Sequence, residues 1–173
     1  MQKIKCVVVG DDGVGKTSLL VTYRTDVFPG TSVPPSVQHF TANMMMENTP
    51  VSLELWDTIA GDEQKMQRKE IYSETDVFLV CFSLVDRESL NDISRKWVKE
   101  IKEHCSTTPF VVVGLKEDLK SERGTTEATV SFEEAEQMSK RLGAVRYLEC
   151  SALIHKHLAE VFEKAANAGL HHK

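Results

Sequence analysis

A glycine-rich stretch near the start of the sequence, GDDGVGKTS over residues 10–18, carries a lysine and a threonine at the spacing of a phosphate-binding loop. In loops of the form G-x-x-x-x-G-K-[ST], backbone N–H groups and the positive end of the following helix hold phosphate groups. Lys16 is placed to contact the outer phosphates, and the Thr17 hydroxyl is placed to ligate Mg²⁺. The stretch therefore predicts a site for the phosphates of a nucleotide.

A second candidate is an acid that directly follows an apolar stretch. Asp57 comes after the apolar residues 51–56, where phosphate-loop proteins carry a carboxylate that holds Mg²⁺, commonly through water. A lone aspartate after a strand is more often a turn residue or a helix cap. Because the phosphate-binding pattern is also present, we interpret Thr17 and Asp57 as a magnesium site.

The elements that position these groups can be predicted from hydrophobic periodicity. Valine-rich apolar runs predict buried strands over residues 5–9, 51–56, 77–84, 110–114 and 145–148. Segments with helical spacing lie between them, over residues 16–25, 88–104, 132–142 and 155–168. This alternation predicts an α/β fold, a doubly wound and mostly parallel sheet whose ligands bind beyond the carboxyl ends of the strands.

Local signals refine this plan. Residues 40–46 and 51–56, joined by Glu47-Asn48-Thr49-Pro50, predict a hairpin that adds one antiparallel edge strand. Ser131 and Glu134 match a capping box, in which both side chains serve free backbone N–H groups, and Gly143 is placed to end the same helix. Residues 28–38 and 120–129 are predicted to be loops.

Composition limits the class of protein. The chain has 173 residues, which predicts one domain over residues 1–173, and its net charge of −5 argues against non-specific nucleic-acid binding. No stretch is long and apolar enough for a membrane span, and the four cysteines and six histidines form no zinc or disulfide pattern. We expect a cytoplasmic monomer with reduced thiols.

Several stretches together resemble a known family. Besides residues 10–17, they are Phe28-Pro29-Gly30, LWDT over residues 55–58, TDVFLVCFSL over residues 75–84, Lys116 with Asp118, and YLECSAL over residues 147–153. The chain is similar over nearly its full length to Ras-superfamily small GTPases, and specifically to their Rho/Rac branch. The resemblance implies the P-loop GTPase fold and a guanine-nucleotide switch that binds GDP or GTP with Mg²⁺.

The resemblance also implies roles for individual residues. Asp118 would accept from the guanine ring, the Lys116 stem would cover the base, and Phe28 would pack on the other side of the nucleoside. The backbone of the Ser151-Ala152 pair would contact the guanine carbonyl. The nucleotide-binding residues that it implies are Asp12, Gly13, Val14, Gly15, Lys16, Thr17, Ser18, Phe28, Lys116, Asp118, Leu119, Ser151, Ala152 and Leu153.

The same resemblance predicts protein partners. Effectors, exchange factors and GTPase-activating proteins would bind through residues 28–40 and 57–72. Membrane association would require a lipidated tail, and residues 169–173 carry neither a C-a-a-X cysteine nor a polybasic run, for which a trimmed chain is the simpler explanation.

The sequence departs from the family pattern where hydrolysis takes place. Asp12 replaces a glycine and would occupy space that the attacking water and an arginine finger need. The family's water-positioning glutamine is absent: Gly61 takes its place in a gapless register, and Asp62 takes it if one residue is inserted. We therefore name Lys16, Gly61 and Asp62 as the catalytic positions and expect slow hydrolysis of GTP.

Two further departures concern nucleotide sensing. Pro35 stands where the family has a magnesium-binding threonine, unless Ser36 substitutes for it, and Leu115 stands where the family has Asn or Thr near the base. The insert typical of the Rho branch is shortened between residues 120 and 131.

An alternative hypothesis is therefore a pseudo-GTPase, an interaction protein that binds guanine nucleotide without appreciable hydrolysis. A phosphate-loop kinase, which would need an arginine-rich lid, is disfavoured.

Overall fold

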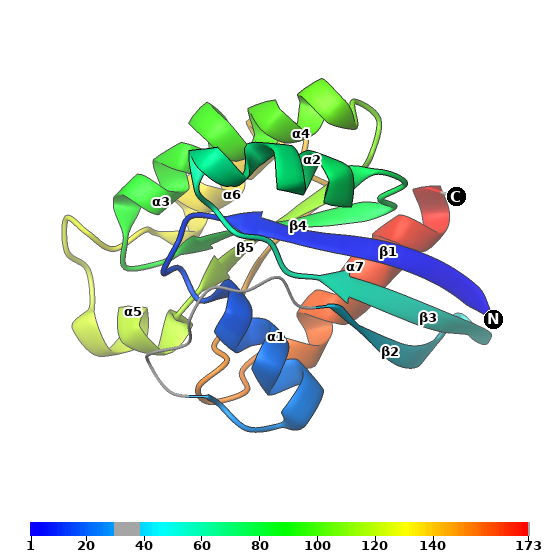
Figure 1. Cartoon of the computed structure of the whole chain (residues 1–173). Helices are drawn as coiled ribbons and strands as arrows, with labels where there is room; N and C mark the ends of the chain where they lie inside the picture. The colour runs from blue at the N-terminus through cyan, green and yellow to red at the C-terminus, as the bar shows by residue number, and fades with distance from the viewer. Residues whose placement is uncertain (30–38, 173) are drawn as a thin grey trace.

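The computed structural model describes residues 1–29 and 39–172. Its centre is a six-stranded sheet in the order β2-β3-β1-β4-β5-β6 (Figure 1). Neighbouring strands are parallel, except for the antiparallel pair of β2 and β3. The strands are β1 (Gln2–Gly10), β2 (His39–Met46), β3 (Thr49–Trp56), β4 (Val77–Ser83), β5 (Phe110–Leu115) and β6 (Arg146–Glu149). The predicted fold class is confirmed, including the antiparallel edge strand.

Helices cover both faces of the sheet. In Figure 1, α1 and α7 lie on one face, and α2, α3, α4 and α6 lie on the other. The helices are α1 (Lys16–Thr25), α2 (Lys65–Tyr72), α3 (Arg87–Asp92), α4 (Val98–His104), α5 (Glu117–Arg123), α6 (Phe132–Leu142) and α7 (Leu158–His172). A π-helix (Ile93–Trp97) joins α3 to α4, and a 3₁₀ turn (Asp62–Gln64) precedes α2.

The alternation of side chains along β1 explains why the sheet needs two helical layers. Cys6 and Val8 pack with Leu19 of α1 and Phe162 of α7, whereas the next residues along the strand pack with the opposite layer. All of these side chains are fully buried. A strand that buries both faces reads as a continuous apolar run, which is the pattern that the sequence shows.

The hairpin between β2 and β3 is tighter than the predicted four-residue turn. Glu47 and Asn48 have φ angles of 51° and 65°, which is the left-handed pair that a two-residue hairpin turn requires. Thr49 and Pro50 therefore belong to β3. Pro50 precedes Val51, the first β3 residue paired with β1, so it stands at the start of the strand, where proline is tolerated.

Other boundaries also differ from prediction. Helix α7 begins at Leu158 rather than His155, because His155 and His157 adopt positive φ angles of 57° and 58°. Strand β6 starts one residue later than predicted. Helix α5 extends into the predicted loop 120–129, and α2 was not predicted at all. Residues 124–130 contain no helix.

At the start of α6, the Ser131 side chain caps the helix as predicted, but the Glu134 side chain does not take part in the capping box. The Ser131 hydroxyl accepts from the Glu134 N–H at 3.2 Å, and Gly143 ends the helix with a φ of 88°. The Glu134 carboxylate, however, forms an ion pair with Arg87. Arg87 also donates to the carbonyl oxygens of Glu127 and Thr129, so it secures the loop that precedes α6.

The described residues include no helix with the length and apolar character that crossing a membrane requires.

Candidate nucleotide-binding site

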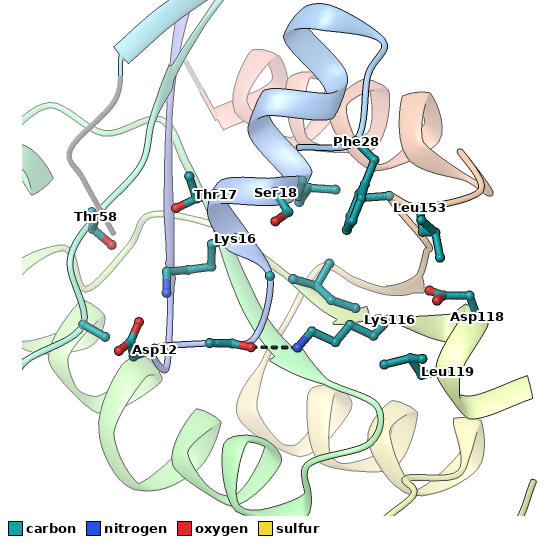
Figure 2. A pocket seen from close by; sticks show the side chains of 16 residues that line it. Asp12, Lys16, Thr17, Ser18, Phe28, Thr58, Lys116, Asp118, Leu119 and Leu153 are labelled. Carbon is teal, nitrogen blue, oxygen red and sulfur yellow. Dashed lines mark hydrogen bonds between the residues drawn. The ribbon is translucent and has the colours of Figure 1, made fainter. Parts of the chain in front are cut away.

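A cavity of about 290 Å³ opens at the carboxyl ends of the sheet (Figure 2). Loops that follow β1, β3, β5 and β6 all contribute to it, as expected for a ligand site in a parallel sheet. Its lining residues are Asp12, Gly13, Gly15, Lys16, Thr17, Ser18, Leu19, Phe28, Thr58, Ala60, Leu115, Lys116, Asp118, Leu119, Ala152 and Leu153. Of the predicted nucleotide-binding residues, all line the cavity except Val14, which is buried in the core, and Ser151.

The loop after β1 depends on glycine. Gly10 has a φ of 152°, and a Cβ atom there would lie 2.3 Å from the Cys81 carbonyl oxygen of the neighbouring strand. Gly15 has a φ of 109° at the N-cap of α1. Asp12, in contrast, has a negative φ, so replacing glycine there introduces no backbone strain. Its side chain is exposed and belongs to the cavity lining.

Lys16 is the first residue of α1, and its side chain reaches back into the loop. Its side chain is 6% exposed, and its ammonium group donates to the carbonyl oxygens of Gly10 at 2.8 Å and Asp11 at 2.9 Å. Burial lowers the pKa of Lys16, whereas the nearby Asp57 carboxylate opposes this effect. Lys16 can thus supply a fixed positive charge to an anion in the cavity.

The residues predicted to hold Mg²⁺ lie together. The Thr17 hydroxyl donates to Asp57 Oδ2 at 2.6 Å, and burial raises the pKa of the fully buried Asp57. In the part of the chain that the structure describes, no group of three or more His, Cys, Asp or Glu side chains could hold a metal ion. The oxygen atoms of Thr17 and Asp57 fit Mg²⁺, which commonly uses one or two protein oxygens together with water and substrate phosphates.

The far end of the cavity is organised by the loop after β5. Lys116 has a φ of 65°, and its ammonium group donates to the Gly13 carbonyl oxygen at 2.8 Å, so its stem spans the cavity wall. Figure 2 shows the Asp118 carboxylate directed into the cavity. The Ser151 hydroxyl donates to Asp118 Oδ1 at 2.7 Å and therefore orients it. The sequence predicted a backbone contact for Ser151 and did not reveal this side-chain role.

The segment after Asp57 is held by cations from outside the cavity. Arg68 is 1% exposed and donates to the carbonyl oxygens of Ile59 at 2.8 Å and Gly61 at 2.6 Å. The intervening Ala60 carbonyl accepts from Lys96 at 2.8 Å. Three successive carbonyl groups are thus tied to side chains of α2 and the π-helix. We call residues 59–61 with Arg68 and Lys96 the carbonyl clamp.

The predicted catalytic positions Gly61 and Asp62 lie in or beside this clamp, and neither lines the cavity. The Asp62 side chain is 96% exposed and pairs with Lys96 at 3.0 Å, which lowers the pKa of the carboxyl group. Their catalytic role stays a prediction. Pro35 and Ser36 lie outside the described residues.

Asp11 connects the phosphate-binding loop to the opposite helical layer. Trp97 of the π-helix donates its indole N–H to Asp11 Oδ1 at 2.9 Å. Burial and a hydrogen bond with the Asp92 carboxyl group raise the pKa of Asp11 to about 6, although Trp97 and Lys96 act in the opposite direction. The pKa of this carboxyl group therefore lies well above the ordinary value for an aspartate.

This titration predicts a pH-dependent stability. The pKa of Asp11 is higher in the folded chain than in the unfolded chain, so the folded chain binds more protons between about pH 4 and about pH 6 and loses stability as pH rises. Because Asp11 is half-buried, we expect the free energy of unfolding to fall by about 1 kcal/mol over this pH range. The Asp11→Asn variant should not show this fall. Denaturant unfolding of the wild type and of Asp11→Asn at about pH 4 and about pH 7 measures the two free energies of unfolding. An equal change with pH in both proteins would contradict the prediction.

The parallel sheet, the glycine-rich loop and the cavity define a phosphate-loop nucleotide-binding protein. The model of the Ras family matches residues 5–170, and the chain belongs to this family. Ras-family proteins are small GTP-binding switches and are generally GTPases. They bind GDP or GTP with Mg²⁺, and they contact regulators and effectors.

Some residues of the site were not predicted from the sequence. Leu19, Thr58 and Ala60 line the cavity, and each is a neighbour in sequence of a predicted site residue, so proximity to a motif was the available signal. Leu115, which the resemblance placed near the base, lines the cavity as well. The cations of the carbonyl clamp gave no such signal, because they lie in no motif and their contacts form only in the folded chain.

Proposed function

We propose that this chain is a Rho-like guanine-nucleotide switch that hydrolyses GTP slowly. The observation that carries the proposal is one cavity with the Lys16 ammonium at its phosphate end and the oriented Asp118 carboxylate at its base end. The Rho-like assignment rests on the sequence stretches that resemble that branch, and it suggests a role in the actin cytoskeleton. The protein would act in the cytoplasm as a monomer.

Guanine selection follows from the chemistry of Asp118. A carboxylate accepts two hydrogen bonds, and the guanine ring offers N1–H and an exocyclic amino group on one edge. Adenine presents an unprotonated N1 there, so the carboxylate would be left with an unmatched acceptor facing it. Such mismatches of buried polar groups give strong discrimination between substrates.

Slow hydrolysis follows from the residues at two positions, 61 and 12. Gly61 has no side chain that could orient water, and the carbonyl clamp engages its backbone oxygen. Asp12 adds a negative charge to the cavity, and at about 4 Å it would repel a phosphate charge by up to about 4 kcal/mol at an effective dielectric constant of about 20. A bound Mg²⁺, held by Thr17 and by Asp57 through water, would supply charge neutralisation for the phosphates.

A second candidate function is a pseudo-GTPase that binds nucleotide without appreciable hydrolysis. The observation that favours it is the carbonyl clamp, because residues 59–61 are already fixed by Arg68 and Lys96 rather than by contacts to a ligand. The partner-binding surface at residues 57–72 would then report poorly on the γ-phosphate.

Two measurements test the proposal. The purified chain is denatured and the released nucleotide is identified by chromatography: GDP or GTP supports the guanine site, and adenine nucleotide or none after incubation with GDP and Mg²⁺ contradicts it. Single-turnover hydrolysis of bound [γ-³²P]GTP then separates the two functions. Cleavage over hours that stops without Mg²⁺ supports the switch, and intact GTP supports the pseudo-GTPase.

Replacing Asp12 by glycine is expected to accelerate single-turnover hydrolysis of GTP about tenfold, or about 1.4 kcal/mol, because side-chain rotation already relieves part of the repulsion. Asp12→Asn, which keeps the volume and removes the charge, is the matched control. A gain in both variants identifies charge as the cause, and a gain in Asp12→Gly alone identifies bulk. An unchanged rate in both would contradict an inhibitory role for Asp12.

A further inference from the structure

A second cavity, of about 300 Å³, lies at the opposite end of the sheet from the nucleotide-binding cavity. Pro109, which precedes β5, lines it together with Val145 and Arg146 at the start of β6. The nucleotide-binding cavity is instead lined by residues at the end of β5 and beyond both strands. Among the described residues, none lines both cavities. A ligand in the second cavity would therefore bind separately from the nucleotide.

Helix α7 supplies the other wall of this cavity. Lys164, Ala168 and His171 are spaced four and three residues apart, so they lie on one face of the helix. Asn167 and His172 line the cavity as well. None of the described lining residues is an aspartate or a glutamate, although the whole chain has a net charge of −5. We call this second cavity the basic cavity.

Lys164 differs from the other lysines that are shielded from water. Each of the other five described lysines that are partly or fully buried donates to an oxygen atom: Lys5, Lys16, Lys96, Lys116 and Lys120. Lys164 is partly buried too, but its ammonium group has no hydrogen-bond or ion-pair partner among the described residues. Shielded polar groups normally have a partner, and an unpaired charge is costly, so this wall of the cavity favours an anion.

Arg146 adds a second cation from β6. It is exposed, and within the described part of the chain its guanidinium group likewise has no hydrogen-bond or ion-pair partner. The Asn167 amide and the Thr107 hydroxyl are neutral donors on the same lining. A guanidinium group binds phosphate through two parallel hydrogen bonds, and an ammonium group adds a point charge. Two cations with additional donors match a dianion with several acceptor oxygens better than they match a single carboxylate.

We propose that the basic cavity binds the phosphate monoester group of a small organic molecule. Lys164 and Arg146 neutralise its two charges, Asn167 and Thr107 donate to its remaining oxygens, and the apolar lining contacts the organic part. A soluble phosphate ester and the headgroup of phosphatidic acid share this chemistry, and the experiment distinguishes the two sources. The inference concerns a site apart from the proposed nucleotide function and does not depend on it.

The experiment is titration of glycerol 3-phosphate into the isotope-labelled chain saturated with GDP and Mg²⁺, followed by NMR. The amide signals of Arg146 and Asn167 should shift, and those of residues 10–18 should stay fixed. Lys164→Met and Arg146→Met should each weaken binding about tenfold, the worth of one hydrogen bond to a charged group. Lys99→Met, at an exposed lysine of α4, is the matched control and should bind as the wild type does.

Sedimentation with phosphatidylcholine vesicles, with and without phosphatidic acid, identifies the source of the phosphate group. Binding of glycerol 3-phosphate supports a soluble ligand, and binding only to vesicles with phosphatidic acid supports a lipid headgroup, provided that Lys164→Met weakens it. Binding of neither probe, equal binding of acetate, or unchanged binding in both Lys164→Met and Arg146→Met overturns the inference.

Circular dichroism checks that the variants are folded, and if one of them does not fold, the other decides the question. Shifts confined to residues 10–18 would place glycerol 3-phosphate in the phosphate-binding loop and would also overturn the inference. None of these outcomes bears on guanine binding, which the released-nucleotide assay tests separately.

Discussion

Replacing Lys16 by methionine is expected to weaken GDP binding about 10³-fold, or about 4 kcal/mol. The Lys16 ammonium group is buried inside the phosphate-binding loop, where two carbonyl oxygens hold it in place. Charge-assisted hydrogen bonds to phosphate are strong in such surroundings, and removing one partner of a buried charged contact typically costs 2–5 kcal/mol or more. Methionine keeps the length of the side chain and loses its charge.

Isothermal titration calorimetry in the presence of Mg²⁺ measures the dissociation constant for GDP. Lys99→Met, at an exposed lysine of α4, is the matched control and should bind GDP as the wild type does. Circular dichroism checks that both variants are folded. A folded Lys16→Met protein that loses less than tenfold in affinity would show that the phosphates are held elsewhere.

Replacing Arg68 by methionine is expected to lower the free energy of unfolding by about 4 kcal/mol. Arg68 donates to both carboxylate oxygens of Glu100, at 2.7 and 3.0 Å, and the Tyr72 hydroxyl also donates to Glu100. Arg68 and Glu100 are 1% and 5% exposed. Removing Arg68 leaves a buried carboxylate without its cation, which typically costs 3–5 kcal/mol. The carbonyl oxygens of Ile59 and Gly61 lose their donor as well.

Urea unfolding followed by circular dichroism, at one fixed excess of GDP, measures this loss. The matched control is Lys69→Met, an exposed neighbour in α2 that should change stability by less than about 0.5 kcal/mol. Replacing Arg68 and Glu100 together by methionine and leucine should recover part of the loss, because no uncompensated charge remains. Equal stability of Arg68→Met and Lys69→Met would contradict the assigned role of the ion pair.

The parts that the sequence predicted well are those with local signals. The loop at residues 10–18 carries its conformation in its own glycines, and the strand that precedes it is marked by an uninterrupted apolar run. Asp118 was named from the family resemblance of the Lys116 and Asp118 pair, and its side chain lines the cavity. In each case the residues that determine the structure are neighbours in the chain, so a pattern can be read without knowledge of the fold.

The parts that were missed depend on distant partners. Arg68 and Glu100 are 32 residues apart, and nothing near either residue indicates that they pair. Glu134 lies in a correct capping-box pattern, yet its carboxylate pairs with Arg87, a stronger partner that comes from 47 residues earlier. The polar α2 has few apolar residues to mark it and is anchored mainly through Arg68 and Tyr72. Tertiary contacts decide these features, and local patterns do not contain them.

The π-helix between α3 and α4 makes two distant loops depend on one helical register. Its consecutive residues Lys96 and Trp97 reach the Ala60 carbonyl group and the Asp11 carboxylate, respectively. Each residue of a helix is rotated by about 100° from the previous one, so losing a single residue from the wider turn would swing both side chains away at once. The π-helical turn therefore couples the loop that contains Asp11 to the loop that contains Ala60, because the position of both loops depends on the same turn of backbone.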